Sequence, residues 1–284
     1  MHVFHDDEDN QFKGTDLTEH RIVTRDAKPI RKTPYRVPFA PREEKESQVR
    51  NMLQKGVIEP SSSPWAAPAN LVPKKSPDGR LKYRFCVDFR TLNAVTQFDT
   101  YPLQVFEEIV ATLHGTKYFS VIDCYSGLWQ VKIAEEDKLK TAFSVPSGHY
   151  NFLRLPYSLS KWPASFQRLI DIVLRDLVDR EYFVFIDDLI VYGKNIEEHA
   201  SRLGHVLERF DRANLQLQPS MCVFAQPQLE YLGYVVSRDG IRRSPEETRA
   251  VKNFPVTRNP KRVRSFLGLA SFYRRLVPNF AQIA

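Results

Sequence analysis

The chain has 284 residues, of which 42% are hydrophobic, and a formal net charge of +7. These values are typical of a globular protein with a full core, built as one large domain or as two or three subdomains. The three cysteines show neither paired spacing nor metal-ligand spacing, which excludes a disulfide framework and a zinc site and indicates a reduced, intracellular compartment. The acidic N-terminus has no signal core, and no run approaches about eighteen apolar residues, so we expect no membrane span.

The first part of the chain carries few signals. Residues 1–40 are polar and punctuated by prolines, which predicts an extended arm on the surface or a linker. An amphipathic helix is expected over residues 42–55, with Gly56 at its C-terminal cap. Strands are expected at residues 70–73 and 81–89, joined by a turn at residues 76–79.

A carboxylate stands at the end of the next expected strand. Residues 117–122 are mostly β-branched and aromatic, and Asp123 follows them directly. On its own, Asp123 fits a helix cap or a turn residue as well as a catalytic group. Further strands are expected at residues 128–133, 141–145 and 150–154, followed by a helix from Pro163 to Leu177 with one apolar face.

Two adjacent aspartates, Asp187 and Asp188, interrupt the strand-like runs 182–186 and 189–192. Two like charges at the tip of a hairpin cost several kcal/mol in water-poor surroundings unless a cation offsets them. A polar hairpin turn is the alternative interpretation. If the strand that ends at Asp123 lies beside this hairpin, the three carboxylates form a site that suits two Mg²⁺ ions, or Mn²⁺, and phosphoryl transfer.

The C-terminal segment is strongly basic. A helix over residues 196–214 precedes it, and residues 241–284 hold ten basic and two acidic residues, a net charge of +8. Helix starts are expected near Ser244 and at Asn259, the second helix running to Leu276 with an apolar core stripe. Basic helices of this kind can follow a nucleic-acid backbone without reading bases, although a solvated helical face has the same composition. The element order predicts an α+β fold, an antiparallel sheet with helices on one face.

Six segments in order resemble one family. They are GVIEPS at 56–61, RFCVDFR at 84–90, YFSVID at 118–123, FIDD at 185–188, YLG at 231–233 and FLGL at 266–269. Over residues 19–284 the chain resembles the reverse transcriptase domain of gypsy-type LTR retrotransposon Pol polyproteins. The resemblance implies a right-hand polymerase with fingers and palm in residues 41–240 and a thumb or connection segment in residues 241–284. It also implies RNA-directed DNA synthesis from dNTPs on a primed RNA or DNA template, with Mg²⁺, in a virus-like particle in the cytoplasm or in the nucleus.

The resemblance implies a role for each matching position. The catalytic, metal-holding carboxylates would be Asp123, Asp187 and Asp188. The residues around the incoming nucleotide would be Lys75, Arg84, Leu128, Tyr157, Ser158 and Gln167. The primer grip would be Tyr231, Leu232 and Gly233.

Several positions depart from the family pattern. Leu128 stands where the family carries an aromatic residue that excludes a 2′-hydroxyl, so weaker rejection of ribonucleotides is expected. Ser158 replaces a glycine, and Lys161 and Trp162 replace an Asn-Ala pair, so side chains would enter a place where backbone approaches the nucleotide. We also expect no RNase H or integrase segment in this chain. A degenerate or co-opted copy that binds nucleic acid with little polymerase activity is therefore a second interpretation, while a two-metal nuclease would explain neither the fingers nor the primer-grip match.

Overall fold

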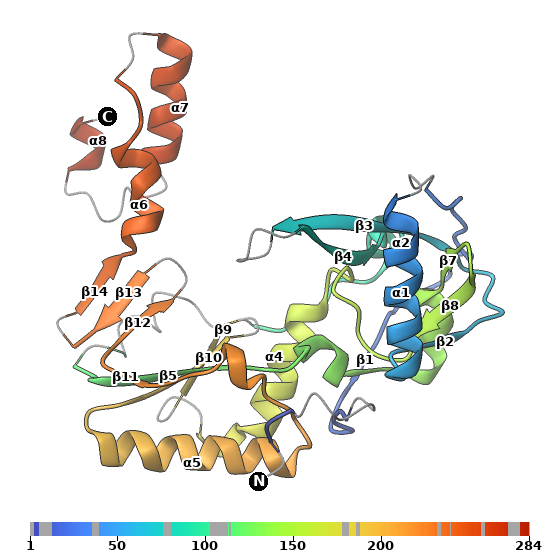
Figure 1. Cartoon of the computed structure of the whole chain (residues 1–284), viewed down its shortest axis with the longest axis horizontal. Coiled ribbons are helices and arrows are strands. Elements are labelled where there is room, and N and C mark those ends of the chain that lie inside the picture. Colours follow the sequence, from blue (N-terminus) through green and yellow to red (C-terminus); the bar gives the residue numbers. More distant parts are fainter. Residues whose placement is uncertain are drawn as a thin grey trace.

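The structure is a computed structural model of the chain. It describes residues 3–5, 13–35, 40–75, 81–102, 113, 115–177, 182–185, 188–231, 234–238, 240–256, 259–271 and 279–283. The chain forms a five-stranded and a four-stranded sheet, among others. Figure 1 shows the first of these with α1 at one end of the molecule, the second with α5 in the middle, and a group of helices at the other end. We call these parts the fingers, the palm and the thumb.

The fingers consist of one helix on a mixed sheet. The strand order is β2 (Ile58–Pro60), β8 (Gly148–Phe152), β7 (Phe143–Val145), β3 (Ala67–Lys75) and β4 (Leu81–Val87), with β3 and β7 parallel. Helix α1 (Ala40–Gln54) closes the open edge of β4: Gln48 donates to Tyr83 O at 2.9 Å and accepts from Phe85 N at 3.1 Å. The buried Lys45 donates to Ala69 O at 2.7 Å. The expected helix and strands are present, and β3 is longer than predicted.

The palm sheet is antiparallel, in the order β11 (Val223–Gln226), β5 (Tyr118–Asp123), β10 (Asp188–Gly193) and β9 (Tyr182–Phe185). One face packs on α4 (Trp162–Val173) and α5 (Ile196–Arg212), where Ile122, Leu189 and Val191 share a core with Val206 and Phe210. Helix α5 begins where the Asn195 side chain accepts from Glu198 N at 2.8 Å. The predicted α+β sheet with helices on one face is thus confirmed.

The other face of the palm sheet meets a small second sheet. This sheet has the order β12 (Gln228–Tyr231), β13 (Tyr234–Ser237) and β14 (Gly240–Arg243). Leu229 and Val236 from it form a separate core with Phe119, Ile190 and Tyr192 of the palm. Because side chains alternate along a strand, Asp123 belongs to the same face as Phe119, opposite the helices.

The predicted strand at residues 128–133 is wrong in its first half. Residues Gly127–Gln130 form a 3₁₀ helix, η1, and only Lys132–Ile133 is a strand, β6. Ser126, with a left-handed φ of 44°, turns the chain out of the extended conformation before η1. A second 3₁₀ helix, η2 (Glu135–Thr141), precedes β7. The helix predicted from Pro163 to Leu177 ends as an α-helix at Val173, and its last residues form the 3₁₀ helix η3 (Arg175–Leu177). The short helices α2 (Arg90–Val95) and η4 (Pro219–Met221) were not predicted.

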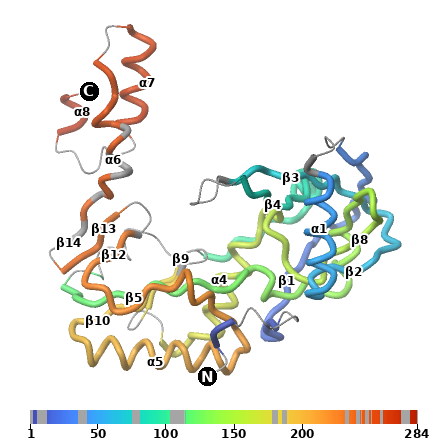
Figure 2. Tube along the Cα trace, viewed as in Figure 1, coloured from blue at the N-terminus to red at the C-terminus, as the bar shows by residue number. Residues whose placement is uncertain are grey.

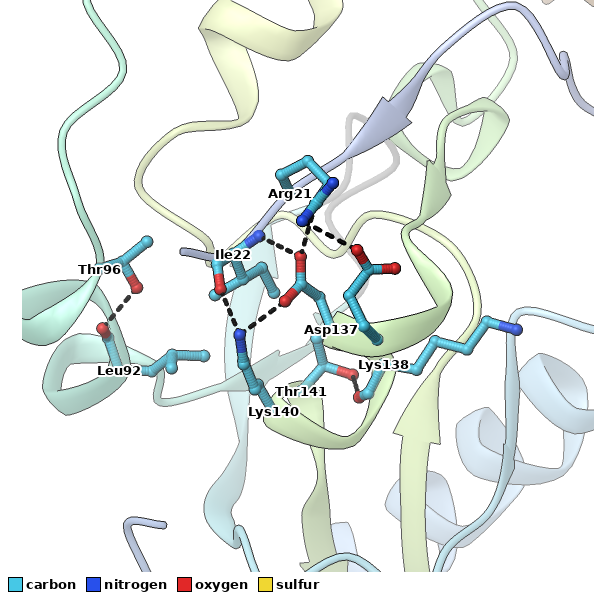
Figure 3. Close-up of polar contacts among 9 residues, drawn as sticks. Arg21, Ile22, Leu92, Thr96, Asp137, Lys138, Lys140 and Thr141 are labelled. Carbon is cyan, nitrogen blue, oxygen red and sulfur yellow. Dashed lines mark hydrogen bonds and ion pairs between the residues drawn. The ribbon is translucent and has the colours of Figure 1, made fainter. Parts of the chain in front are cut away.

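The N-terminal arm is extended, as expected, but one of its sides is buried. His20, Ile22 and Thr24 are buried and alternate with exposed residues, and β1 (Glu19–His20) pairs in parallel with β6. Figure 3 shows how Asp137 holds the arm: its carboxylate accepts from Ile22 N at 2.7 Å, while Lys140 Nζ donates to Asp137 at 2.6 Å and to Ile22 O at 2.7 Å. The alternation was hidden in the sequence because two of the buried residues are polar.

The thumb helices stand apart from the fingers, on the far side of the palm (Figures 1 and 2). They are α6 (Pro245–Lys252), α7 (Pro260–Ser271) and α8 (Phe280–Ile283), and α6 and α7 begin where predicted. The predicted core stripe on α7 is wrong for its described residues: none is buried, and Val263 is 38% exposed. The basic side chains Arg249, Lys252, Lys261, Arg262 and Arg264 are exposed. No described helix combines the length and the apolar character needed to cross a membrane.

Candidate active site

Two of the three expected aspartates are paired residues of neighbouring strands at one end of the palm sheet. The antiparallel register pairs Asp188 of β10 with Asp123 of β5 and with Phe185 of β9. Directly opposite residues in such a ladder have Cα atoms about 5 Å apart and belong to the same face. Asp187 belongs to the connection between Phe185 and Asp188 and lies outside the described residues. The condition set in the sequence analysis, that the strand ending at Asp123 lies beside the hairpin, is therefore met.

The backbone of Asp123 is held by a segment that follows α5. The N–H of Gln218 donates to Asp123 O at 2.9 Å. Cys222 Sγ lies 3.5 Å from Asp123 N and 3.8 Å from Asp123 O. Burial raises the pKa of the Cys222 thiol, and the negative charge of Asp123 acts in the same direction, so the thiol is neutral at pH 7.

The loop after Asp123 is fixed through Tyr125. The N–H of Tyr125 donates to Gln216 O at 2.9 Å, and its carbonyl accepts from Gln130 Nε2 at 2.9 Å. The Tyr125 hydroxyl accepts a hydrogen bond from Lys55 Nζ at 2.9 Å. The His5 ring stacks on the Tyr125 ring, with the two centroids 3.5 Å apart. These contacts join residues from distant parts of the chain and have no local signal in the sequence, so the analysis of motifs did not find them.

The segment after Pro156 combines exposed and buried positions. Tyr157 is exposed and Ser158 is half-buried. The amide of Asn93 in α2 holds the backbone, donating to Ser158 O at 3.1 Å and accepting from Ser160 N at 3.1 Å. Lys161 is buried, and Trp162 is half-buried against the main core, so these two side chains turn inward from this segment.

Two other expected nucleotide-site residues are buried. Leu128, in η1, is 2% exposed and belongs to the main core. Gln167, in α4, is 1% exposed and donates to Asp171 Oδ1 at 3.0 Å. The hydroxyl of Tyr101 donates to the other oxygen of Asp171 at 2.6 Å. The structure therefore places Leu128 and Gln167 in the interior, whereas Tyr157 is exposed.

The remaining expected residues lie on two hairpins. In the fingers, Lys75 at the end of β3 pairs with Leu81, and the exposed Arg84 pairs with Val72. In the small sheet on the Asp123 face of the palm, Tyr231 ends β12 and pairs with Tyr234. Leu232 and Gly233, which connect that pair, lie outside the described residues, as does the expected turn at residues 76–79.

The donor set at the palm suits a hard divalent cation. Aspartates at paired positions of two neighbouring strands supply carboxylates, the oxygen ligands that Mg²⁺ prefers together with water. Within the described residues, no group of three or more histidine, cysteine, aspartate or glutamate side chains gathers to hold a metal ion. Asp187, the third carboxylate of the expected set, belongs to the undescribed connection.

Comparison with known proteins gives consistent matches. The family model for reverse transcriptase (RNA-dependent DNA polymerase) matches residues 72–236. The chain is 41% identical over 267 residues to the retrovirus-related Pol polyprotein from transposon opus of Drosophila melanogaster. The aligned residues make up 94% of this chain and 26% of that relative. The corresponding polyprotein from transposon gypsy of the same organism is 39% identical over 240 residues, 84% of this chain and 23% of the relative.

A solved structure shares the fold. A foamy viral protease-reverse transcriptase in complex with double-stranded DNA superimposes with a TM-score of 0.84 and 26% identity, over 96% of this chain and 47% of that one. The chain spans about a quarter of the length of the curated relatives that it matches. With the fold, the facing carboxylates and the family match in agreement, the chain belongs to the reverse transcriptase family, and its relatives include gypsy-type retrotransposon Pol polyproteins.

Proposed function

We propose that this chain is the polymerase portion of a retrotransposon Pol polyprotein and catalyses RNA-directed DNA synthesis. The observation that carries the proposal is the register of Asp188 opposite Asp123 in the β5–β10 ladder. Membership of the reverse transcriptase family supports the same reaction.

In the proposed reaction, the primer 3′-hydroxyl attacks the α-phosphate of a dNTP. A new P–O bond forms to the primer oxygen, the bond to the β-phosphate breaks, and pyrophosphate leaves. Asp123, Asp187 and Asp188 would hold Mg²⁺ ions, which when bound supply Lewis-acid stabilisation of the attacking and leaving oxygens. The protein's own contribution is position: the β5–β10 ladder and the core beneath it fix the spacing of the carboxylates.

The template–primer duplex is the proposed macromolecular partner. The small sheet, in which Tyr231 ends β12, lies on the same palm face as Asp123, and a primer end would be held there. Leu232 and Gly233, which follow Tyr231 in the sequence, would complete this primer grip. The exposed lysines and arginines of α6 and α7 would contact phosphates, which predicts binding that weakens with salt and has little sequence preference.

The fingers hairpin is the proposed triphosphate grip. Arg84 is exposed on β4, and Lys75 ends the neighbouring strand, so both occupy the hairpin that projects from the finger sheet. Arginine binds phosphate through its planar fork and lysine through a point charge. Leu128, Tyr157, Ser158 and Gln167 complete the proposed nucleotide site.

Primer extension tests the proposal. Purified chain is incubated with a 5′-labelled DNA primer on an RNA template, then on a DNA template, with dNTPs and Mg²⁺. Extension on both templates that stops with EDTA and in Asp123→Asn supports the proposal. Salt-dependent duplex binding without extension would instead support the second interpretation, a copy that binds nucleic acid and does not polymerise, with Ser158→Gly as the first reversion to examine.

A further inference from the structure

Lys161 presents a buried ammonium group without a hydrogen-bond partner among the described residues. The residue is 9% exposed, and Nζ is fully covered. Burial of an unpaired ammonium is costly, so lysine is almost never buried in this way without a partner. Lys161 is also a departure of this chain from the family pattern, which carries asparagine here.

Among the described residues, the groups near Lys161 do not neutralise its positive charge. The nearest ring, Phe98, has its centroid 5.9 Å from Nζ. The carboxylate of Asp99 acts on Lys161 electrostatically, but it already accepts two hydrogen bonds from Arg168, at 3.0 and 3.1 Å. His20, the other titratable group nearby, has its pKa lowered to about 4 by burial and is neutral at pH 7. Burial lowers the pKa of Lys161 too, and Asp99 opposes that shift.

Lys161 also lies at the N-terminus of a helix, where the helix dipole is positive. Lys161 is the N-cap of α4, a helix of 12 residues with no acidic residue in its first turn. The N-terminus of a helix carries a partial positive charge and favours anions. A cation at this end is therefore unfavourable, whereas at the C-terminal end it would stabilise the helix. A buried cation at the positive end of a helix is a site built for an anion.

Exposed residues precede Lys161 along the chain. Lys161 directly follows the Tyr157–Ser160 stretch, in which Tyr157 and Ser160 are exposed and Asn93 clamps the backbone. Phe98, whose ring centroid lies 5.9 Å from Nζ, is 79% exposed. The ammonium therefore lies next to an exposed ring as well as next to the stretch that holds the exposed Tyr157 and Ser160.

We propose that Lys161 binds a phosphate group of the substrates, and that its ammonium is released from beneath Phe98 when the phosphate arrives. The phosphate belongs either to the nucleic-acid backbone or to the dNTP. This inference rests on the proposed function, because both sources are polymerase substrates.

The experiment compares Lys161→Met with Lys138→Met, a matched control that removes the same charge from a lysine paired with Glu135 on η2. Three quantities are measured for each: the Kd for a template–primer duplex, the slope of log Kd against log salt, and the KM for dNTP. A backbone phosphate predicts a Kd about three- to tenfold weaker in Lys161→Met and a salt slope smaller by about 1, with KM unchanged. A dNTP phosphate predicts a KM raised about tenfold, with Kd and slope unchanged.

Two further variants keep the test decisive. Lys161→Arg retains the charge and should restore most of the lost binding, and Phe98→Ala should leave binding equal or tighter. Lys161→Met should melt no lower than the wild type, because it removes an unpaired buried charge; if it melts lower, Lys161→Gln replaces it in the comparison. The inference is overturned if the Lys161 variant matches Lys138→Met in Kd, slope and KM. A wild-type chain that fails to extend primers would count against the proposed function, while the duplex-binding arm would still test Lys161.

Discussion

Gln130 and Gln216 form a reciprocal pair of hydrogen bonds, although 86 residues separate them. The N–H of Gln216 donates to Gln130 Oε1 at 2.7 Å, and Gln130 Nε2 donates to Gln216 O at 2.8 Å. The side-chain amide of Gln130 thus makes the pair of hydrogen bonds with the backbone of Gln216 that a neighbouring strand would otherwise make. Because Gln218, two residues later, donates to Asp123 O, this pair joins the Asp123 loop to the segment that positions it.

Replacing Gln130 by Met should lower both stability and activity. The change leaves the buried N–H of Gln216 and the carbonyl of Tyr125 without this partner, which costs about 1 to 3 kcal/mol for each unsatisfied group. We expect a lower midpoint in urea denaturation and an extension rate reduced about tenfold at temperatures where the variant is folded. Gln226→Met, at an exposed glutamine, is the control. A Gln130 variant that behaves like this control would show that the pair does not position Asp123.

Leu128→Phe should restore selection against ribonucleotides. Leucine is shorter than the aromatic residue usual in the family, so the wild type should incorporate rNTPs measurably, and a ring should reduce that incorporation. Since Leu128 is buried in the main core, the larger side chain should also cost about 1 to 3 kcal/mol of stability. The ratio of kcat/KM for a dNTP to that for the matching rNTP is the measurement; a ratio unchanged by the substitution would rule out a gate at this position.

His20 should make the fold less stable in mild acid. Burial lowers its folded-state pKa to about 4, below the unfolded value near 6.5, so the unfolded state takes up the proton first as the pH falls. Stability should be constant above about pH 7 and lower by about 2 kcal/mol at pH 5. Urea denaturation of the wild type and of His20→Gln at both pH values tests this. An equal drop in the variant would assign the acid sensitivity to other groups.

Asp137 and Lys140 should be coupled in holding the N-terminal arm. Asp137→Ala removes the acceptor for Ile22 N and leaves Lys140 without its carboxylate, which should cost about 3 kcal/mol. Adding Lys140→Met should cost less than the sum of the two single changes, because the unpaired charge is then removed as well. Additive free energies of unfolding in this double-mutant cycle would mean that the contacts in Figure 3 do not act as a unit.

The strands and long helices could be predicted because their signals are local. The β-branched and aromatic residues of β5, the apolar runs on both sides of Asp187 and Asp188, and the capping residues before α6 are all legible within a few residues. The register of Asp123 with Asp188 followed from the same patterns once both strands were placed in one sheet.

The errors came from interactions between distant residues. The apolar alternation from Leu128 to Ile133 resembles a strand, but Ser126 turns the chain and Gln130 bonds to Gln216, which produces a 3₁₀ helix instead. The core stripe expected on α7 needs a second surface to cover it, and the described thumb helices pack chiefly on one another, as in the contact of Phe254 with Phe266. A single helix pattern cannot reveal which neighbour it has.

Rapid-quench measurement of single-nucleotide incorporation tests the central role of the facing carboxylates most directly. Wild type, Asp123→Asn and Asp188→Asn are each bound to an RNA template with a DNA primer and mixed with the next dNTP and Mg²⁺, with the exposed Asp176→Asn as the control. We expect both palm variants to lose about a thousandfold in rate, equivalent to about 4 kcal/mol of transition-state stabilisation, with the duplex Kd within about threefold of the wild type. Incorporation by either palm variant at more than about a tenth of the wild-type rate would contradict a catalytic centre built on Asp123 and Asp188.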